Sequence, residues 1–413
     1  MPTLYNTDTG GTIRADAARR RVTFVLKTSK FCNLRCRYCY EFADLGNTHA
    51  MDRSQLQTMY QNIAEHYRRC SSPVEIEFDW HGGEPLLLGA DFFWKTFDDQ
   101  TRVFNDERIT VSNLVQTNLA VINDELIKLL YEGFDGVGVS IDLFGGLRVS
   151  SAGKDCQERV LGNMDQIRRA GVKFGCITVL SKQNVHRAAQ IFKFFQRAAI
   201  SFRLLPIFRG ATDEQNDDYA LTPLQVLESF KEFFELWVGC STQITIDPLF
   251  AYTENLLAGR LLNRSKSAAW GQYDKRIWES IYIVNTDGNV YSYADIYNLQ
   301  LSHGNIFQNA LSKLVLSTGH LRAIQAAETR MQSVCPKCRH FGRGCGGYPV
   351  AEESPNSGEM SVDGKVSCVK DQGILDYIER RLWEMGIIDP ITGEVSLPSG
   401  YRPRCPHEPV VSI

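Results

Sequence analysis

Three closely spaced cysteines, Cys32, Cys36 and Cys39, point more directly to chemistry than any other residues of this sequence. Their C-x3-C-x2-C spacing follows an apolar run, Val22 to Leu26, that is typical of a buried strand. A loop this tight turns three thiolates onto one centre and leaves a fourth position without a protein ligand. A [4Fe–4S] cluster held in this way keeps one iron open. A zinc knuckle is the alternative, but its nearest further ligand, His49, lies ten residues beyond Cys39. The spacing therefore favours an iron–sulfur cluster.

A second stretch, His81-Gly82-Gly83-Glu84-Pro85, follows an alternating run, Val74 to Phe78, that is typical of a strand. Glycines permit close approach of the backbone to a ligand, and the Glu84 carboxylate accepts hydrogen bonds from an ammonium group. Pro85 fixes the direction in which the chain leaves. A plain turn is the alternative to a ligand-binding loop.

A second group of cysteines lies near the C-terminus, at Cys335, Cys338, Cys345 and Cys368. Four thiolates suit zinc as well as an iron–sulfur cluster, and the residues alone leave both open. Gly344, Gly346 and Gly347 surround Cys345 and fit a backbone that wraps closely on a metal centre. We assign no role to the scattered cysteines, which are Cys70, Cys156, Cys176, Cys240 and Cys405.

The elements that must position these residues alternate between strand and helix about six times. This alternation predicts a parallel sheet with helices outside, and six units favour a partial (β/α)6 barrel over a closed eight-fold one. The polar motifs fall at the C-terminal ends of strands, where barrel enzymes build their active sites. We expect strands at 22–26, 74–78, 109–115, 136–142, 172–180 and 202–206, and helices at 51–69 (capped by Asp52), 92–105, 124–131, 159–170 and 185–199.

Beyond the barrel, residues 222–260 carry helical patterning, and residues 281–291 are typical of a hairpin with a tight turn. Helices are expected over 311–330 and 371–383. The predicted organisation is an arm at 1–20, the barrel at 21–215, bridging helices at 216–275, a small α+β cluster domain at 276–375 and a tail at 376–413.

Composition narrows the class of protein. The chain has 413 residues and a net charge of −3, with no basic stripe, so we expect no nucleic-acid partner. No apolar run is long enough to span a bilayer, and the polar N-terminus lacks a signal core. We therefore predict a cytoplasmic protein without a membrane partner. Its 12 cysteines then favour metal binding over disulfides, because cytosolic thiols stay reduced.

The two N-terminal motifs together resemble those of the radical S-adenosylmethionine (radical SAM) superfamily. The resemblance to the barrel of that superfamily runs from about residue 20 to about residue 215. The C-terminal cysteines resemble those of SPASM-type peptide-modifying members. The resemblance implies a [4Fe–4S] cluster on Cys32, Cys36, Cys39 and SAM, with the Gly82–Pro85 loop at the amino group of SAM. The reduced cluster then cleaves SAM to a 5′-deoxyadenosyl radical, which abstracts a hydrogen atom from the substrate.

The same resemblance implies further SAM contacts. Ser140 and Asp142 correspond to residues that contact the ribose or carboxylate of SAM, although strand-end capping is an alternative for both. Asn118 is similarly placed. Arg159 corresponds to a partner of the carboxylate, or else to a solvated helix arginine. Tyr38 is expected to lie against the adenine.

The C-terminal half departs from the SPASM pattern. The segment after the hairpin, Tyr291-Ser292-Tyr293-Ala294-Asp295, has no cysteine, and Pro349 stands where another is expected. The resemblance therefore implies one auxiliary [4Fe–4S] cluster, on Cys335, Cys338, Cys345 and Cys368, in preference to zinc. Asp295 stands close to the catalytic base of sulfatase-maturing relatives, with a structural carboxylate as the alternative.

From this resemblance we predict a maturase that cross-links a ribosomally made precursor peptide (leader plus core) into a cyclophane-type ring. Flavodoxin or ferredoxin is the expected reductant. Only 31 residues precede Cys32, too few for the precursor-binding domain that many relatives carry. One alternative is the oxidation of a sulfatase Cys or Ser to formylglycine. The other is a non-catalytic iron–sulfur or zinc protein that acts as a scaffold or redox sensor.

Overall fold

The computed structural model describes residues 20–207, 217–261, 280–292, 298–351, 358–360 and 366–396. Asp295 and Cys405 lie outside these residues, as does nearly all of the arm predicted for residues 1–20. No helix in these ranges is long and apolar enough to cross a membrane.

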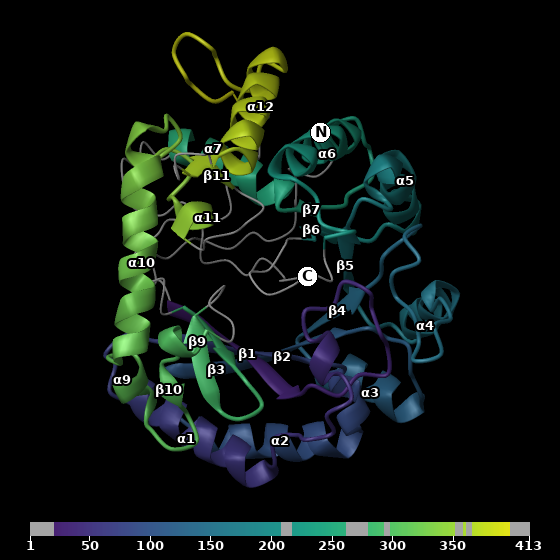
Figure 1. The fold of residues 1–413 in the computed structure, drawn as a ribbon, viewed down its shortest axis with the longest axis vertical. Helices are drawn as coiled ribbons and strands as arrows, with labels where there is room; N and C mark the ends of the chain where they lie inside the picture. Colours follow the sequence, from purple (N-terminus) through teal and green to yellow (C-terminus); the bar gives the residue numbers. More distant parts are fainter. Residues whose placement is uncertain are drawn as a thin grey trace.

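A curved sheet, ten strands wide within the described residues, organises the chain (Figure 1). Its centre consists of parallel neighbours that follow one another in sequence, as expected where helices provide the crossovers. This is the architecture of the predicted partial barrel. The strands are β1 (Arg20–Ser29), β2 (Val74–Gly82), β3 (Ile109–Thr117), β4 (Gly136–Ser140), β5 (Gly175–Leu180) and β6 (Phe202–Pro206).

The crossover helices lie on the outside of the curved sheet (Figure 1). α1 begins at the predicted cap, where the Asp52 side chain accepts from Gln55 N and the Gln55 side chain accepts from Asp52 N. Between helices and sheet lies an aromatic core in which Trp80 of β2 meets Phe93 of α2 edge to face, at 5.3 Å between ring centroids. The helices are α1 (Arg53–Arg68), α2 (Ala90–Val103), α3 (Asp124–Glu132), α4 (Gln157–Arg169) and α5 (Ala188–Ala198).

Both ends of the sheet extend beyond the six predicted strands. β7 (Ile246–Asp247) pairs with β6 in parallel, inside the segment expected to be helical. At the other end β8 (Ile281–Val284) pairs with β1 in parallel, and β9 (Asn289–Ser292) and β10 (Gly304–Asn305) follow in antiparallel order. The predicted hairpin therefore continues the barrel sheet. The domain boundaries stay predictions.

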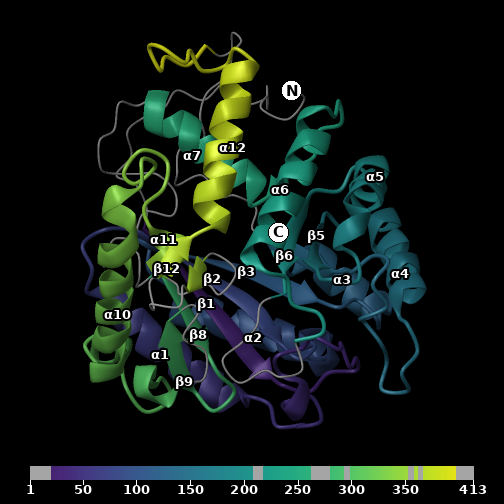
Figure 2. The same ribbon diagram turned by 45° about the horizontal axis from the view of Figure 1, so that its top comes forward.

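The C-terminal helices stand against the two ends of this sheet. α12 (Lys370–Glu384) packs along α6 (Pro223–Val238), where Tyr377 OH and Arg381 Nε donate to Glu235 Oε1 at 2.8 and 2.7 Å (Figure 2). The helix predicted over 311–330 is divided because Ser317 caps a new helix there. The remaining elements are α7 (Leu249–Leu261), α9 (Leu311–Leu314), α10 (Thr318–Val334), α11 (Tyr348–Ala351), β11 (Gly358–Met360) and β12 (Val366–Cys368).

Candidate active site

The loop that carries the first three cysteines begins where β1 ends and is fastened by backbone hydrogen bonds. Cys32 N donates to Leu45 O at 3.1 Å, and Arg35 N and Arg37 N donate to the segment after β4, at Val149 O and Leu147 O. Leu34 N also donates to Cys32 Sγ at 3.4 Å. Because the loop is held from two sides, the three thiols occupy fixed positions beside the C-terminal ends of β1 and β4.

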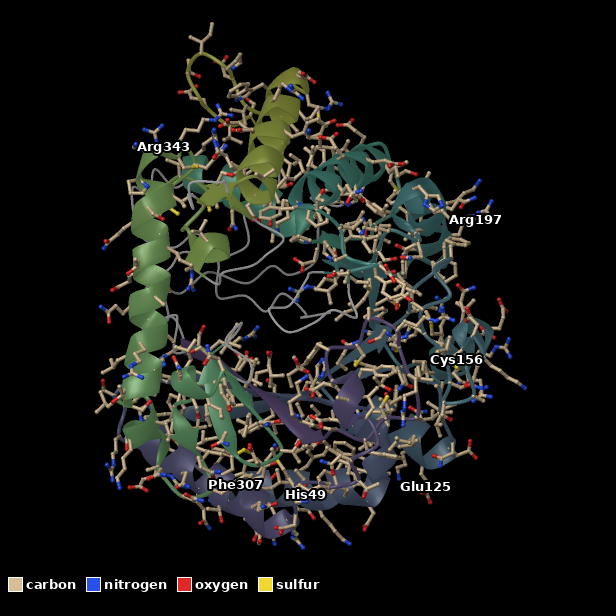
Figure 3. The ribbon with its side chains drawn as sticks, viewed as in Figure 1. His49, Glu125, Cys156, Arg197, Phe307 and Arg343 are labelled. Carbon is tan, nitrogen blue, oxygen red and sulfur yellow. The ribbon has the colours of Figure 1, made fainter. Side chains whose placement is uncertain are left out.

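The thiols themselves are suited to a metal centre. Burial raises the pKa of Cys32 to about 12 and that of Cys39 to about 11, so the bare thiols stay protonated at neutral pH. A bound metal would hold them as thiolates. The alternative zinc ligand, His49, has an exposed side chain (Figure 3). Across the described part of the chain, no three His, Cys, Asp or Glu side chains converge tightly enough for a single metal ion.

Glu84 is a buried carboxylate with spare acceptor capacity. Its Oε1 accepts from Thr117 Oγ1 at 2.7 Å and from Leu86 N at 3.1 Å, and its Oε2 accepts from Asn118 N at 2.7 Å. Burial raises the pKa of Glu84, and these donors oppose that effect. A carboxylate has about four acceptor positions, so one remains on Oε2 for the predicted ammonium group.

The two glycines before Glu84 hold their loop close to the chain that leads to Cys32, and their predicted role at a ligand stays a prediction. A Cβ on Gly82 would stand 2.2 Å from Ser29 O, and a Cβ on Gly83 would stand 2.2 Å from Phe31 O. Gly83 N and Glu84 N donate to these same carbonyls, at 2.8 and 2.9 Å. The glycines thus let this loop press against the chain that leads to Cys32, and they join the two motifs into one unit.

A buried charge cluster follows β4, and its arginine is absent from our sequence prediction. Tyr38 OH donates to Asp142, Arg148 Nη1 donates to Tyr38 OH at 2.8 Å, and Arg148 lies 3.5 Å from Asp142. Burial raises the pKa of Cys36, and the Arg148 charge counteracts this. Cys156, labelled in Figure 3, is the residue before α4. Its backbone N–H donates to Arg148 O at 3.0 Å. Arg148 Nε has no hydrogen-bond partner within the described residues, so it can still donate to a ligand.

Of the remaining residues predicted to contact SAM, some lie near the cysteine loop or at a strand end, and one is exposed. Asn118 lies in the site, because its Nδ2 donates to Asn33 Oδ1 at 2.8 Å and to Cys32 Sγ at 3.6 Å. Ser140 lies at the end of β4 and accepts from Gln116 Nε2 at 2.7 Å. Arg159, by contrast, is exposed on the first turn of α4, which agrees with its alternative as a solvated helix arginine. Arg148, by contrast, lies close enough to Cys36 for its charge to lower the pKa of that thiol.

The second cysteine group also comes together. Cys335, Cys338, Cys345 and Cys368 line one pocket, whose other walls are mainly apolar. Gly347 has a φ of +81°, and a Cβ there would stand 3.1 Å from Cys335 Sγ, so this position requires glycine. Burial raises the pKa of Cys335, Cys345 and Cys368 to about 12 each. Four thiols around one pocket fit an iron–sulfur cluster. The remaining walls are Val334, Phe341, Gly347, Val350, Gln372 and Leu375.

Comparison with known proteins agrees with this geometry. Residues 26–195 match the family model of the radical SAM superfamily. A cysteine-type anaerobic sulfatase-maturating enzyme of Clostridium novyi is 27% identical over 299 residues, which cover 69% of this chain and 76% of the relative. A serine-type anaerobic sulfatase-maturating enzyme of Klebsiella aerogenes is 31% identical over 165 residues, which cover 39% of this chain and 40% of the relative.

Solved structures share the fold. The structure of anSMEcpe with bound AdoMet has a TM-score of 0.69 at 20% identity and covers 88% of this chain and 98% of its own. SuiB of Streptococcus suis with S-adenosylmethionine has a TM-score of 0.53 at 14% identity and covers 82% of this chain and 76% of its own. The predicted fold class is confirmed, as are the predicted cofactors SAM and [4Fe–4S]. How many auxiliary clusters there are stays a prediction.

One functional prediction is wrong. The sequence predicts a maturase that cross-links a precursor peptide, but curated relatives that match over much of the chain are sulfatase-maturating enzymes of the cysteine and serine types. Sequence motifs did not separate the two classes, because the cluster and SAM loops serve radical formation in both. Asp295, the predicted base, lies outside the described residues.

Proposed function

We propose that this protein is a radical SAM enzyme that oxidises a Cys or Ser side chain of a polypeptide to formylglycine, as sulfatase maturation requires. The observation that carries the proposal is its similarity to cysteine- and serine-type anaerobic sulfatase-maturating enzymes, over as much as 81% of the chain. The site geometry supports it, because Glu84 keeps a free acceptor position close to Asn118 and Cys32.

Each group of residues in the site would have its own role. Cys32, Cys36 and Cys39 would hold the cluster, and Glu84 would receive the amino group of SAM. Arg148 Nε, which is buried and has no hydrogen-bond partner within the described residues, would donate to an anionic group of the ligand. When bound, SAM and the reduced cluster supply the radical that removes a hydrogen atom from the substrate. The four C-terminal cysteines would hold an auxiliary cluster.

The substrate would be a peptide segment, and the reductant a flavodoxin or ferredoxin. Structures of anSMEcpe have been solved with AdoMet and the peptides Cp18Cys and Kp18Cys. The shared fold makes a peptide the natural first substrate to try for this chain.

The test uses protein reconstituted with iron and sulfide under anaerobic conditions. Sulfatase-derived peptides with Cys or Ser at the target position are incubated with SAM and dithionite. We expect 5′-deoxyadenosine together with a peptide aldehyde, detected by mass spectrometry and by hydrazide trapping. The matched control is the variant in which Cys32, Cys36 and Cys39 are all Ala. Formation of 5′-deoxyadenosine without aldehyde from either peptide would contradict the proposed substrate class.

A further inference from the structure

A buried lysine, Lys27, lies near the end of β1, five residues before Cys32, and its exposed fraction is only 1%. Strand register places it beside His81 of β2. Trp80 packs outward on Phe93 of α2, and side chains alternate along a strand, so His81 and Lys27 point to the inside of the barrel. A buried charge is costly unless it has partners, so the contacts of this ammonium group indicate what it serves.

The Lys27 ammonium joins the two N-terminal motifs. Its Nζ donates to the hydroxyl of Tyr40, the residue after Cys39, and lies 4.8 Å from the centre of the Tyr40 ring. On its other side, Nζ lies 3.2 Å from His81 Nδ1. Gly82 N donates to that same ring nitrogen at 2.9 Å, so the nitrogen is an acceptor and the lysine is the donor. Lys27 thus contacts both the cysteine loop and the start of the glycine loop.

A negative charge, Glu41, lies on the same side of the cysteine loop. It is buried, and its carboxylate lies 3.9 Å from Lys27 Nζ and 3.2 Å from Lys30 Nζ. Lys30 has a second partner at 2.7 Å in Asp44, whose side chain is half exposed. Solvent and salt screen buried charges much less than exposed ones, so Lys27 and Glu41 act on their surroundings more strongly than Asp44 does.

The nearest metal ligand to both charges is Cys39. Phe42 N donates to Cys39 O at 3.1 Å, so residues 39–42 form one turn, and Tyr40 and Glu41 are its central residues. Lys27 contacts both of these central side chains. Burial raises the pKa of the Cys39 thiol, and the Glu41 carboxylate adds to this effect. A backbone hydrogen bond from Glu41 and the charge of Lys27 lower the same pKa.

Charges placed in this way affect electron uptake by a cluster. The reduction potential of an iron–sulfur cluster depends on its net charge, on hydrogen bonds to its sulfurs and on its exposure to solvent. One electron from a reductant of the flavodoxin or ferredoxin class adds one negative charge to a centre that three thiolates already make more negative. No covalent bond forms or breaks and no proton moves in that step. A nearby cation therefore favours the reduced form, and a nearby anion disfavours it.

We propose that Lys27 and Glu41 are positioning residues that set the reduction potential of the cluster on Cys32, Cys36 and Cys39 by opposing charges. Lys27 raises this potential and Glu41 lowers it, and both act through the turn that begins at Cys39. The inference needs a cluster on these three cysteines, as the proposed function does. It is independent of which side chain of which peptide the enzyme oxidises.

The test is a redox titration, monitored by electron paramagnetic resonance, of full-length protein reconstituted with iron and sulfide. The signal of this cluster is the one that is absent from the variant in which Cys32, Cys36 and Cys39 are all Ala. Iron content is measured for every variant, and potentials are compared at equal iron content. The reduction potential is a readout that does not depend on turnover of SAM or of a peptide.

We expect Lys27→Met to lower the potential and Glu41→Gln to raise it. Each change should alter the equilibrium constant for reduction about tenfold, or about 59 mV for a one-electron couple. The double variant should lie close to wild type, because both charges are gone. The matched control is Lys95→Met, which removes an exposed lysine that pairs with Asp91 on the outer helix α2. It should leave the potential at the wild-type value.

The opposite signs separate an electrostatic role from a structural one, because a loosened loop would move both potentials in the same direction. Equal directions, or shifts no larger than that of Lys95→Met, would overturn the inference. If Lys27→Met does not bind iron, Glu41→Gln decides alone, since it keeps the shape of the side chain. If no signal depends on the three cysteines, their assignment as ligands fails and the inference fails with it. Shifts of the expected signs in a protein that forms no aldehyde would support the inference and contradict only the proposed function.

Discussion

The two cysteine groups have contrasting surroundings. Cys32 and its partners lie among buried polar groups, namely Glu84, Asn118, Asp142 and Arg148, and several of these retain hydrogen-bonding capacity. The C-terminal group lies against Val334, Phe341, Val350 and Leu375. Three thiols with polar neighbours describe a centre prepared for a ligand, whereas four thiols with apolar neighbours describe a centre that is complete by itself. The neighbouring side chains therefore distinguish the roles of the two sites more clearly than the number of cysteines does.

Replacing Cys32, Cys36 and Cys39 by Ala should have the largest effect. We expect 5′-deoxyadenosine formation to be lost completely, and the iron content of reconstituted protein to fall from about eight to about four per chain. Iron and sulfide assays with activity measurements check this. If iron fell and SAM cleavage persisted, the ligand-binding role would belong to the other group.

Replacing Cys335 and Cys338 by Ala should separate SAM cleavage from peptide oxidation. We expect the loss of about four irons, with SAM cleavage retained and peptide oxidation lost. Zinc in place of these irons, measured by plasma emission spectrometry, would make this site structural and contradict the predicted auxiliary cluster.

Glu84→Gln should weaken SAM binding by about 2–4 kcal/mol, because a buried charge-assisted partner is removed while Thr117 and the Asn118 N–H remain. Isothermal titration of the reconstituted protein measures this. Glu77→Gln, which removes a carboxylate from the inner face of the barrel, should leave the SAM affinity at the wild-type value.

Gly83→Ala should destabilise the protein by about 2–4 kcal/mol, since the new Cβ would lie 2.2 Å from Phe31 O. Gly162→Ala in α4 is the control. That position has no atom within 4 Å, and alanine favours a helix, so the protein should be about 0.5–1 kcal/mol more stable. Urea unfolding measures both. Equal stabilities would refute the close joining of the two motifs.

The contiguous motifs were predictable and the long-range pairings were not. Cys32, Gly82 and Glu84 stand in short runs whose spacing carries the chemistry, and the alternation of strands and helices predicts the barrel. Arg148 lies in a loop without a motif, and only the fold shows that it pairs with Tyr38 and Asp142. β7 is two residues long, too short to show periodicity. The hairpin was predicted locally, but its pairing with β1 joins segments about 250 residues apart.

That pairing has a consequence for how the protein is made. β1 leads directly into the first cysteine loop, and one of its edges is covered by β8, with Thr286 Oγ1 donating to Lys27 O at 2.7 Å. During synthesis the chain emerges N-terminus first, so this edge stays open until about two-thirds of the protein has left the ribosome. An open strand edge can pair with other chains. Chaperone protection of the nascent chain, and cluster insertion after release, would thus favour a high yield of correctly assembled protein.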